Sequence, residues 1–258
     1  MKNTYKKIDI SYTLLFIMFL SLISGLFKDI IILFMIIIIH EMGHIFTSNL
    51  FKWRIHKISI GVVGGYITYD EVIDKPFKEE FLIGISGFLF QLILFIVSLF
   101  LYNNNLIDYK IFFLIKKYNI SIFIFNLIPI YPLDGSKLLN VLFNMFVPYK
   151  KSLKITNIVS FIFIFVILLN FFCFDIKFEL SYIMIFSFLI KKLINYIKDI
   201  PYLFNRLLFE RYIHPIKSRK YIIIKGSNIN KFRRQRKHIF LLKNKEYTEK
   251  SILSKRFD

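Results

Sequence analysis

The chain has 258 residues, of which 56% are hydrophobic and 21% charged, and its formal net charge is +19. Its apolar residues form long continuous runs instead of amphipathic spacing, which excludes an ordinary soluble domain. The single cysteine, Cys173, excludes an internal disulfide and a cysteine-rich metal site. The composition therefore predicts a protein that crosses the membrane several times.

Six apolar runs mark the candidate membrane spans. A helix needs about 20 apolar residues to cross the hydrocarbon core, so the first run is short, and Lys116 and Lys117 interrupt the fourth. We expect an all-α polytopic fold, with a membrane-embedded domain over residues 1–200 and a basic cytoplasmic tail over 201–258. The six runs cover residues 12–27, 29–51, 81–101, 109–130, 153–174 and 180–197.

The distribution of positive charge predicts the orientation of these spans. From Arg206 onward the chain has 16 Lys and Arg against 4 Asp and Glu, so +12 of the net charge lies in this last part. Cytoplasmic loops carry the excess of Lys and Arg, and six spans with both termini in the cytoplasm satisfy this rule. We therefore expect a cell-membrane protein whose tail contacts anionic lipid or helps to dock an acidic or membrane-bound substrate. Direct nucleic-acid binding is not expected, because only charge supports it.

The second apolar run contains His40, Glu41 and His44. On a helix the two histidines lie one turn apart on the same face, so both can ligate one metal ion. Glu41 can then act as a general base toward a water on that metal. Ionisable groups in a membrane-length helix are costly and are rarely kept without a function. The alternative is an ion relay in a membrane metal transporter or channel, which predicts further polar residues along several spans.

Two histidines leave a zinc site short of a third protein ligand. Thr47 and Leu50 stand where the metzincin extension requires Gly and His, so that family is excluded. Asp134 is the favoured third ligand, because prolines and a glycine in segment 126–135 break a span around it. The alternative for this carboxylate is an N-cap of a helix over 135–146. The carboxylates considered near membrane depth are Asp70, Glu71, Asp74, Asp108 and Asp134.

Two further segments differ from plain membrane helices. Residues 53–70 contain alternating and β-branched residues around glycines, which predicts a β-hairpin or re-entrant loop after the second helix. Its edge can pair with an extended substrate, or the segment can be a simple connector at the interface. Gly84, Ser86 and Gly87 form a small-residue patch, which predicts close helix–helix packing.

Together, the two motifs resemble the site-2 protease family of intramembrane zinc metalloproteases, peptidase family M50. His40-Glu41-x-x-His44 matches the zinc motif of that family, and the segment from Asn126 to Pro132-Leu133-Asp134-Gly135 matches its second motif. Within the family, the chain most resembles the stage IV sporulation protein FB group, through residues 51–55, the Gly64-Gly65 loop and residues 126–135. The resemblance covers roughly residues 8–200.

The chain departs from this family in two places. Relatives often have Ala-Gly-Pro where this chain has Ser86-Gly87-Phe88, which affects the local helix start and packing. Relatives in the sporulation group commonly end in a paired CBS module, for which the tail is too short. Strands over 221–225 and 238–243 around a basic helix over 230–237 would resemble half of such a module, and we do not assign ATP binding to it.

The resemblance implies a function for each motif residue. His40, His44 and Asp134 would hold Zn²⁺, and Glu41 would be the general base. Asn126 would position substrate or steady the oxyanion, although an interhelical hydrogen bond explains it equally well. The implied substrate is a membrane-associated sporulation sigma-factor precursor, and inhibitory membrane proteins are the implied regulators. The implied location is the mother-cell membrane around the forespore.

Overall fold

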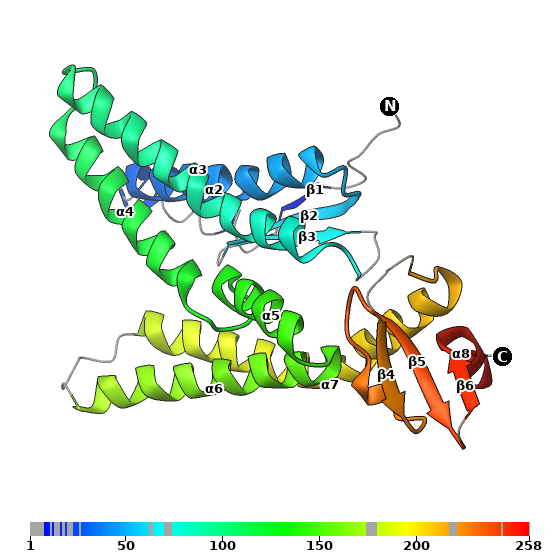
Figure 1. The fold of residues 1–258 in the computed structure, drawn as a ribbon. Helices are drawn as coiled ribbons and strands as arrows, with labels where there is room; N and C mark the ends of the chain where they lie inside the picture. The colour runs from blue at the N-terminus through cyan, green and yellow to red at the C-terminus, as the bar shows by residue number, and fades with distance from the viewer. Residues whose placement is uncertain are drawn as a thin grey trace. The chain divides into compact units, whose positions relative to one another are not determined.

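The computed structural model divides the chain into two compact units, which are described separately (Figure 1). The first unit comprises residues 1–71 and 81–126, and the second comprises residues 72–80 and 127–258. The structure describes residues 8–10, 12, 16, 19, 23–25, 27–61, 64–69, 74–173, 180–216, 221–243 and 245–257.

The first unit combines helices with a small sheet. Helix α2 (Phe27–Leu50) leads into strands β2 (Ile55–Gly61) and β3 (Gly64–Tyr69). These strands pair antiparallel as a hairpin, which confirms the prediction for residues 53–70, and β1 (Ile8–Ile10) adds a third strand parallel to β2. β3 is therefore an edge strand of the sheet. The unit also contains most of α3 (Phe77–Asn103) and nearly all of α4 (Tyr109–Leu127).

Close backbone contact holds α2 against α3. A Cβ on Gly43 of α2 would lie 2.5 Å from the backbone oxygen of Ser86 in α3. The small residues at this crossing therefore let two helix backbones approach, as the sequence predicts for the Ser86-Gly87 patch. α3 also contacts α4, where the Asn119 side-chain amide donates to the Gln91 carbonyl at 2.9 Å.

Among the described residues, three helices are long and apolar enough to cross a membrane. They are α2, α3 and, in the second unit, the part of α6 up to Asn170. α4 carries Lys110, Lys116 and Lys117, and the first of the six expected spans lies largely outside the described residues. The chain is thus a mostly helical membrane protein, while six spans remain a prediction.

The second unit packs three helices against a small α/β module. The helices are α5 (Asp134–Phe146), α6 (Tyr149–Cys173) and α7 (Leu180–Ile213). The module contains β4 (Tyr221–Lys225), β5 (Lys237–Leu242), β6 (Lys245–Thr248) and α8 (Glu249–Phe257), with β4 parallel and β6 antiparallel to the central β5. The core that α7 shares with this module includes fully buried Leu207, Leu208, Phe232, Phe240 and Leu253.

The predicted helix over residues 230–237 is wrong. Only a single 3₁₀ turn, Ile229–Lys231, forms there, and the chain then runs as a loop with Gln235 at a φ of +57°. The backbone groups of this loop bond to side chains instead of to a helical ladder. The Arg233 amide donates to His238, and the carbonyls of Arg233 and Arg236 accept from Arg211.

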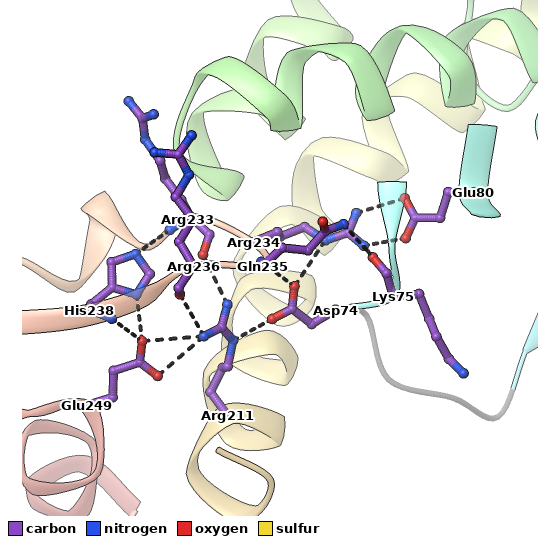
Figure 2. Close-up of polar contacts among 10 residues, drawn as sticks. All are labelled: Asp74, Lys75, Glu80, Arg211, Arg233, Arg234, Gln235, Arg236, His238 and Glu249. Atoms are coloured by element: carbon purple, nitrogen blue, oxygen red, sulfur yellow. Dashed lines mark hydrogen bonds and ion pairs between the residues drawn. The ribbon is translucent and has the colours of Figure 1, made fainter. Parts of the chain in front are cut away.

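Buried charges fix this loop in the second unit (Figure 2). The Arg211 side chain is 1% exposed, and its Nε lies 2.6 Å from Oδ2 of Asp74, whose side chain is 3% exposed. Arg211 also pairs with Glu249 at 3.4 Å. Two carboxylates and two backbone carbonyls thus surround one guanidinium that is shielded from water, with Nε held by charge attraction to Asp74.

We expect Arg211→Ala to destabilise this unit by about 3–5 kcal/mol, because it leaves Asp74 and Glu249 buried without their shared cation. Chemical unfolding in detergent, followed by proteolysis of the module, measures the change. Arg206→Ala is the matched control, since that side chain is 37% exposed and pairs with Glu210 on the same helix. Equal stability of the Arg211→Ala and Arg206→Ala proteins would contradict the expectation.

Candidate metal centre

His40 and His44 meet on the buried face of α2. Their side chains project from successive turns, and the residues are 1% and 6% exposed. The two Nε2 atoms are 3.2 Å apart, and the rings are nearly perpendicular, at an interplanar angle of 83°. The spacing of four residues therefore brings two imidazole nitrogens to one point, as the sequence predicts.

Helix α3 sets the orientation of both rings. Nδ1 of His44 lies 2.6 Å from the Ile83 carbonyl oxygen, and Nδ1 of His40 lies 3.1 Å from Oε1 of Gln91. The Ile83 carbonyl can only accept, so Nδ1 of His44 carries the proton, and with Oε1 of Gln91 facing it, Nδ1 of His40 does the same. Each Nε2 then presents a lone pair, which is the form in which a histidine ligates a metal.

This donor set fits a cation and little else. Two lone pairs that face each other at 3.2 Å repel unless a positive charge lies between them. Zinc–imidazole bonds of about 2.0–2.1 Å in a tetrahedral site place two nitrogens about 3.3 Å apart. The pair is therefore arranged for a tetrahedral metal ion before any other ligand is considered.

Glu41 lies beside this pair and contacts the hairpin. Its Oε1 accepts a hydrogen bond from the Gly65 amide at 3.2 Å, and the residue is 9% exposed. Tyr69 at the other end of β3 shares a 2.9 Å hydrogen bond with Ser48 of α2. The hairpin is thus fixed to α2 at two points, and one of them holds the carboxylate expected to act as the base.

Two glycines leave room for these functional side chains. A Cβ on Gly65 would overlap the Glu41 carboxyl group. A Cβ on Gly87 would lie 2.5 Å from Nε2 of His44 and 2.6 Å from Cε1 of His40. The small-residue pattern predicts only helix packing for Gly87, and no pattern in the sequence identifies Gly65 or Gln91 as a site residue. The only sequence feature that points to Gln91 is its polar side chain within the apolar run of α3.

Asp134 belongs to the second unit and follows the predicted break. α4 ends at Leu127 and α5 begins at Asp134, which is the first residue of that helix, whereas Leu133 occupies the N-cap position. The carboxylate is buried and accepts from Lys137 at 2.8 Å. Asp134 is therefore not an N-cap, and like His40 and His44 it is a buried side chain with a potential ligand atom.

The break itself is held by the helices that follow it. The Ser160 hydroxyl of α6 donates to the Pro129 carbonyl and accepts from the Tyr131 amide, and Tyr131 stacks on Tyr196 of α7. The Tyr131–Pro132 peptide is cis. A Cβ on Gly135 would overlap the Leu127 carbonyl, so this glycine permits the tight return of the chain.

The other residues weighed for the site have different surroundings. Asp74 is paired with Arg211, and Asp108 is exposed at the start of α4. Asn126 is half-buried near the end of α4. Asp70 and Glu71 lie outside the described residues.

The fold and the histidine pair define a membrane protein with a metallopeptidase centre. The family model of Peptidase family M50 matches residues 29–108 and 102–170. The chain is 34% identical to stage IV sporulation protein FB of Bacillus subtilis over 206 residues, which is 80% of this chain and 71% of that protein. The chain therefore belongs to peptidase family M50.

Two comparisons with archaeal sequence and structure support the same assignment. A zinc metalloprotease of Methanocaldococcus jannaschii is 32% identical over 161 residues, which is 57% of this chain and 46% of that protein. The solved structure of a site-2 protease from the same organism aligns with a TM-score of 0.55 and 25% identity, covering 73% of this chain and 89% of that one. The protein is a metalloprotease with zinc as its cofactor, and the alternative of a metal transporter is not supported.

We expect Gly65→Ala to lower peptide cleavage about 100-fold, because the added methyl group displaces the Glu41 carboxylate. The zinc content should stay at the wild-type level, since Gly65 does not contact either histidine in this way. Cleavage assays and metal analysis of the purified protein measure the two effects. Thr68→Ala on the same strand is the control, and wild-type activity of Gly65→Ala would contradict this geometry.

For Gly87→Ala we expect a loss of zinc binding, in contrast to Gly65→Ala. Its methyl group would press on both imidazoles, so zinc affinity should fall about 10-fold or more. Competition with a zinc-binding dye gives the affinity. Leu89→Ala, on the same helix at a side chain that is 49% exposed, should bind zinc normally. Unchanged affinity in Gly87→Ala would mean that the histidines do not need this space.

Proposed function

We propose that the protein cleaves a membrane-associated protein substrate at a zinc site made by His40, His44 and Asp134. The observation that carries this proposal is the facing pair of Nε2 atoms, with both Nδ1 atoms hydrogen-bonded to α3 and a carboxylate beside them. Asp134 is the third ligand because it is a buried carboxylate in the segment that matches the second family motif. Asp74 is already paired and Asp108 is exposed.

Glu41 acts as the general base in this proposal. When bound, zinc supplies Lewis-acid activation of water and of the scissile carbonyl. Glu41 takes the proton of the attacking water on its carboxylate and passes it to the leaving amine. The Gly65 amide bonds to Oε1 and so restricts the rotation of this carboxylate. Asn126 positions the substrate or stabilises the oxyanion.

The hairpin is the proposed docking edge for the substrate. β3 is an edge strand, and an extended peptide can add to such an edge through backbone hydrogen bonds. Gly65, which contacts Glu41, belongs to this strand. A segment paired with β3 would therefore pass close to the proposed base.

The proposed substrate is a sporulation sigma-factor precursor, and the likeness to stage IV sporulation protein FB supports it. Six spans with both termini in the cytoplasm would open the site toward the cytoplasm, where a membrane-bound precursor is accessible. In this proposal the protein lies in the mother-cell membrane around the forespore. Membrane proteins that inhibit it until a signal arrives are the proposed regulators.

Glu41→Gln tests the catalytic assignment. Because the amide keeps the shape of the side chain but cannot take a proton, cleavage of a co-expressed sigma-factor precursor should disappear while zinc stays bound. Immunoblotting for the shortened factor and metal analysis give the two readouts. Cleavage by Glu41→Gln would refute the role of this base, and a wild-type protein without zinc would refute the metal site.

Asp134→Ala tests the third ligand. Loss of one of three protein ligands should lower zinc affinity far more than Asp108→Ala, which removes an exposed carboxylate. Both proteins are compared by dye competition and by their unfolding in detergent. Equal zinc affinities in the two variants would exclude Asp134 as a ligand, whatever the cleavage assay shows.

A further inference from the structure

The C-terminal module forms hydrogen bonds and an ion pair with a short segment that runs from just before α3 into its first turn (Figure 2). This segment, residues 74–80, belongs to the same compact unit as the module. The Gln235 amide donates to Oδ1 of Asp74 at 2.7 Å, and the Gln235 side chain donates to the Lys75 carbonyl at 2.8 Å. The loop that replaces the expected helix over 230–237 is thus a binding element for this segment.

Arg234 makes the contact that reaches α3 itself. Its guanidinium bonds both carboxylate oxygens of Glu80, in the first turn of the helix, and donates to the Lys75 carbonyl at 3.2 Å. The Phe77 ring lies 5.2 Å from the guanidinium carbon. A planar guanidinium that bonds both oxygens fixes the orientation of a carboxylate as well as its distance.

Burial makes this contact strong. Arg234 is 5% exposed, and the Glu80 side chain is 17% exposed. Burial lowers the pKa of the Arg234 guanidinium, but the charge and hydrogen bonds of Glu80, together with the charges of Tyr149 and Asp74, outweigh it and raise that pKa above its ordinary value. The guanidinium therefore keeps its charge, and breaking the pair would leave that charge poorly solvated.

The same helix carries the two groups that orient the histidines. α3 is continuous from Phe77 to Asn103, and Ile83 lies three residues beyond Glu80, a rise of about 4.5 Å. Gln91 lies three turns beyond Glu80. A shift or rotation of the first turn along the helix axis would therefore move the Ile83 carbonyl that holds Nδ1 of His44.

We infer that Arg234 and Glu80 are positioning residues of the metal centre, which act through α3 on the tautomer and orientation of His44 and His40. This inference rests on the proposed function, since it takes the two histidines as ligands. The C-terminal module is then a structural part of the protease, joined to the site through the first turn of one helix. Neither Arg234 nor Glu80 touches the metal or the substrate in this role.

Glu80→Gln and Arg234→Lys test the inference in the full-length protein in detergent. Each keeps the size of its side chain and weakens the paired contact. We expect both to speed the loss of zinc to a chelator about 10-fold, because changes that disturb the orientation of a ligand weaken metal binding. Substitution of zinc by Co²⁺ should also give an altered visible spectrum, which a purely structural role would leave unchanged.

Two controls separate positioning from general stability. Glu79→Gln removes the same charge from the same helical turn, so the effect on the helix dipole is matched and zinc should be lost at the wild-type rate. Glu249→Gln weakens the module at its contacts with Arg211 and His238 and removes no direct contact with α3. We expect it to lower the unfolding temperature of the module with little effect on zinc loss.

The outcomes are decisive in each direction. Wild-type zinc loss in Glu80→Gln, or equally fast loss in Glu79→Gln, would overturn the inference. Equally fast loss in Glu249→Gln would assign the effect to stability of the module instead. Should Arg234→Lys fail to fold, the comparison of Glu80→Gln with Glu79→Gln still decides. Retention of zinc by His40→Ala would instead refute the metal site, independently of Arg234.

Discussion

The two hydrogen bonds that the histidine pair donates to α3 decide which ring nitrogens can ligate a metal. A histidine in a membrane-length helix can have either ring nitrogen protonated, and only one choice turns Nε2 into a ligand. The Ile83 carbonyl leaves His44 no alternative, because it cannot donate. Gln91 favours the same form of His40 when its Oε1 faces Nδ1. The zinc motif on α2 is therefore half of a chemical unit whose other half is a neighbouring helix.

This dependence explains why small residues gather at the crossing of α2 and α3. A carbonyl can reach an imidazole nitrogen at 2.6 Å only if the two helix backbones come close. Gly43 and Gly87 permit that approach, because a methyl group at either position would collide with the opposite helix. The close packing of α2 and α3 and the orientation of the imidazoles therefore depend on the same two glycines, and a larger side chain at either position would disturb both.

Parts of this arrangement can be predicted from the sequence because the relevant interactions are local. The four-residue spacing of His40 and His44 fixes their common face, and the hairpin at residues 53–70 follows from glycines and alternation. Ile83 could not be predicted, because its contribution is a backbone oxygen that every residue has. The role of Gly65 depends on where a distant strand lies, which short-range patterns do not contain. The helix expected over 230–237 fails because tertiary ion pairs outweigh local helix propensity.

The same ion pairs change the meaning of the basic tail. Residues 206–258 have a formal net charge of +12. This count assumes that every Arg and Lys side chain is available to a lipid surface. Arg211 and Arg234 are buried, and Asp74, Glu80 and Glu249 surround them. Two of these three carboxylates lie outside the tail, so a count confined to the tail misses them. Buried guanidinium groups paired in this way hold the fold together and do not contribute a surface charge, so the positive surface charge of the module comes from its exposed lysines and from Arg256.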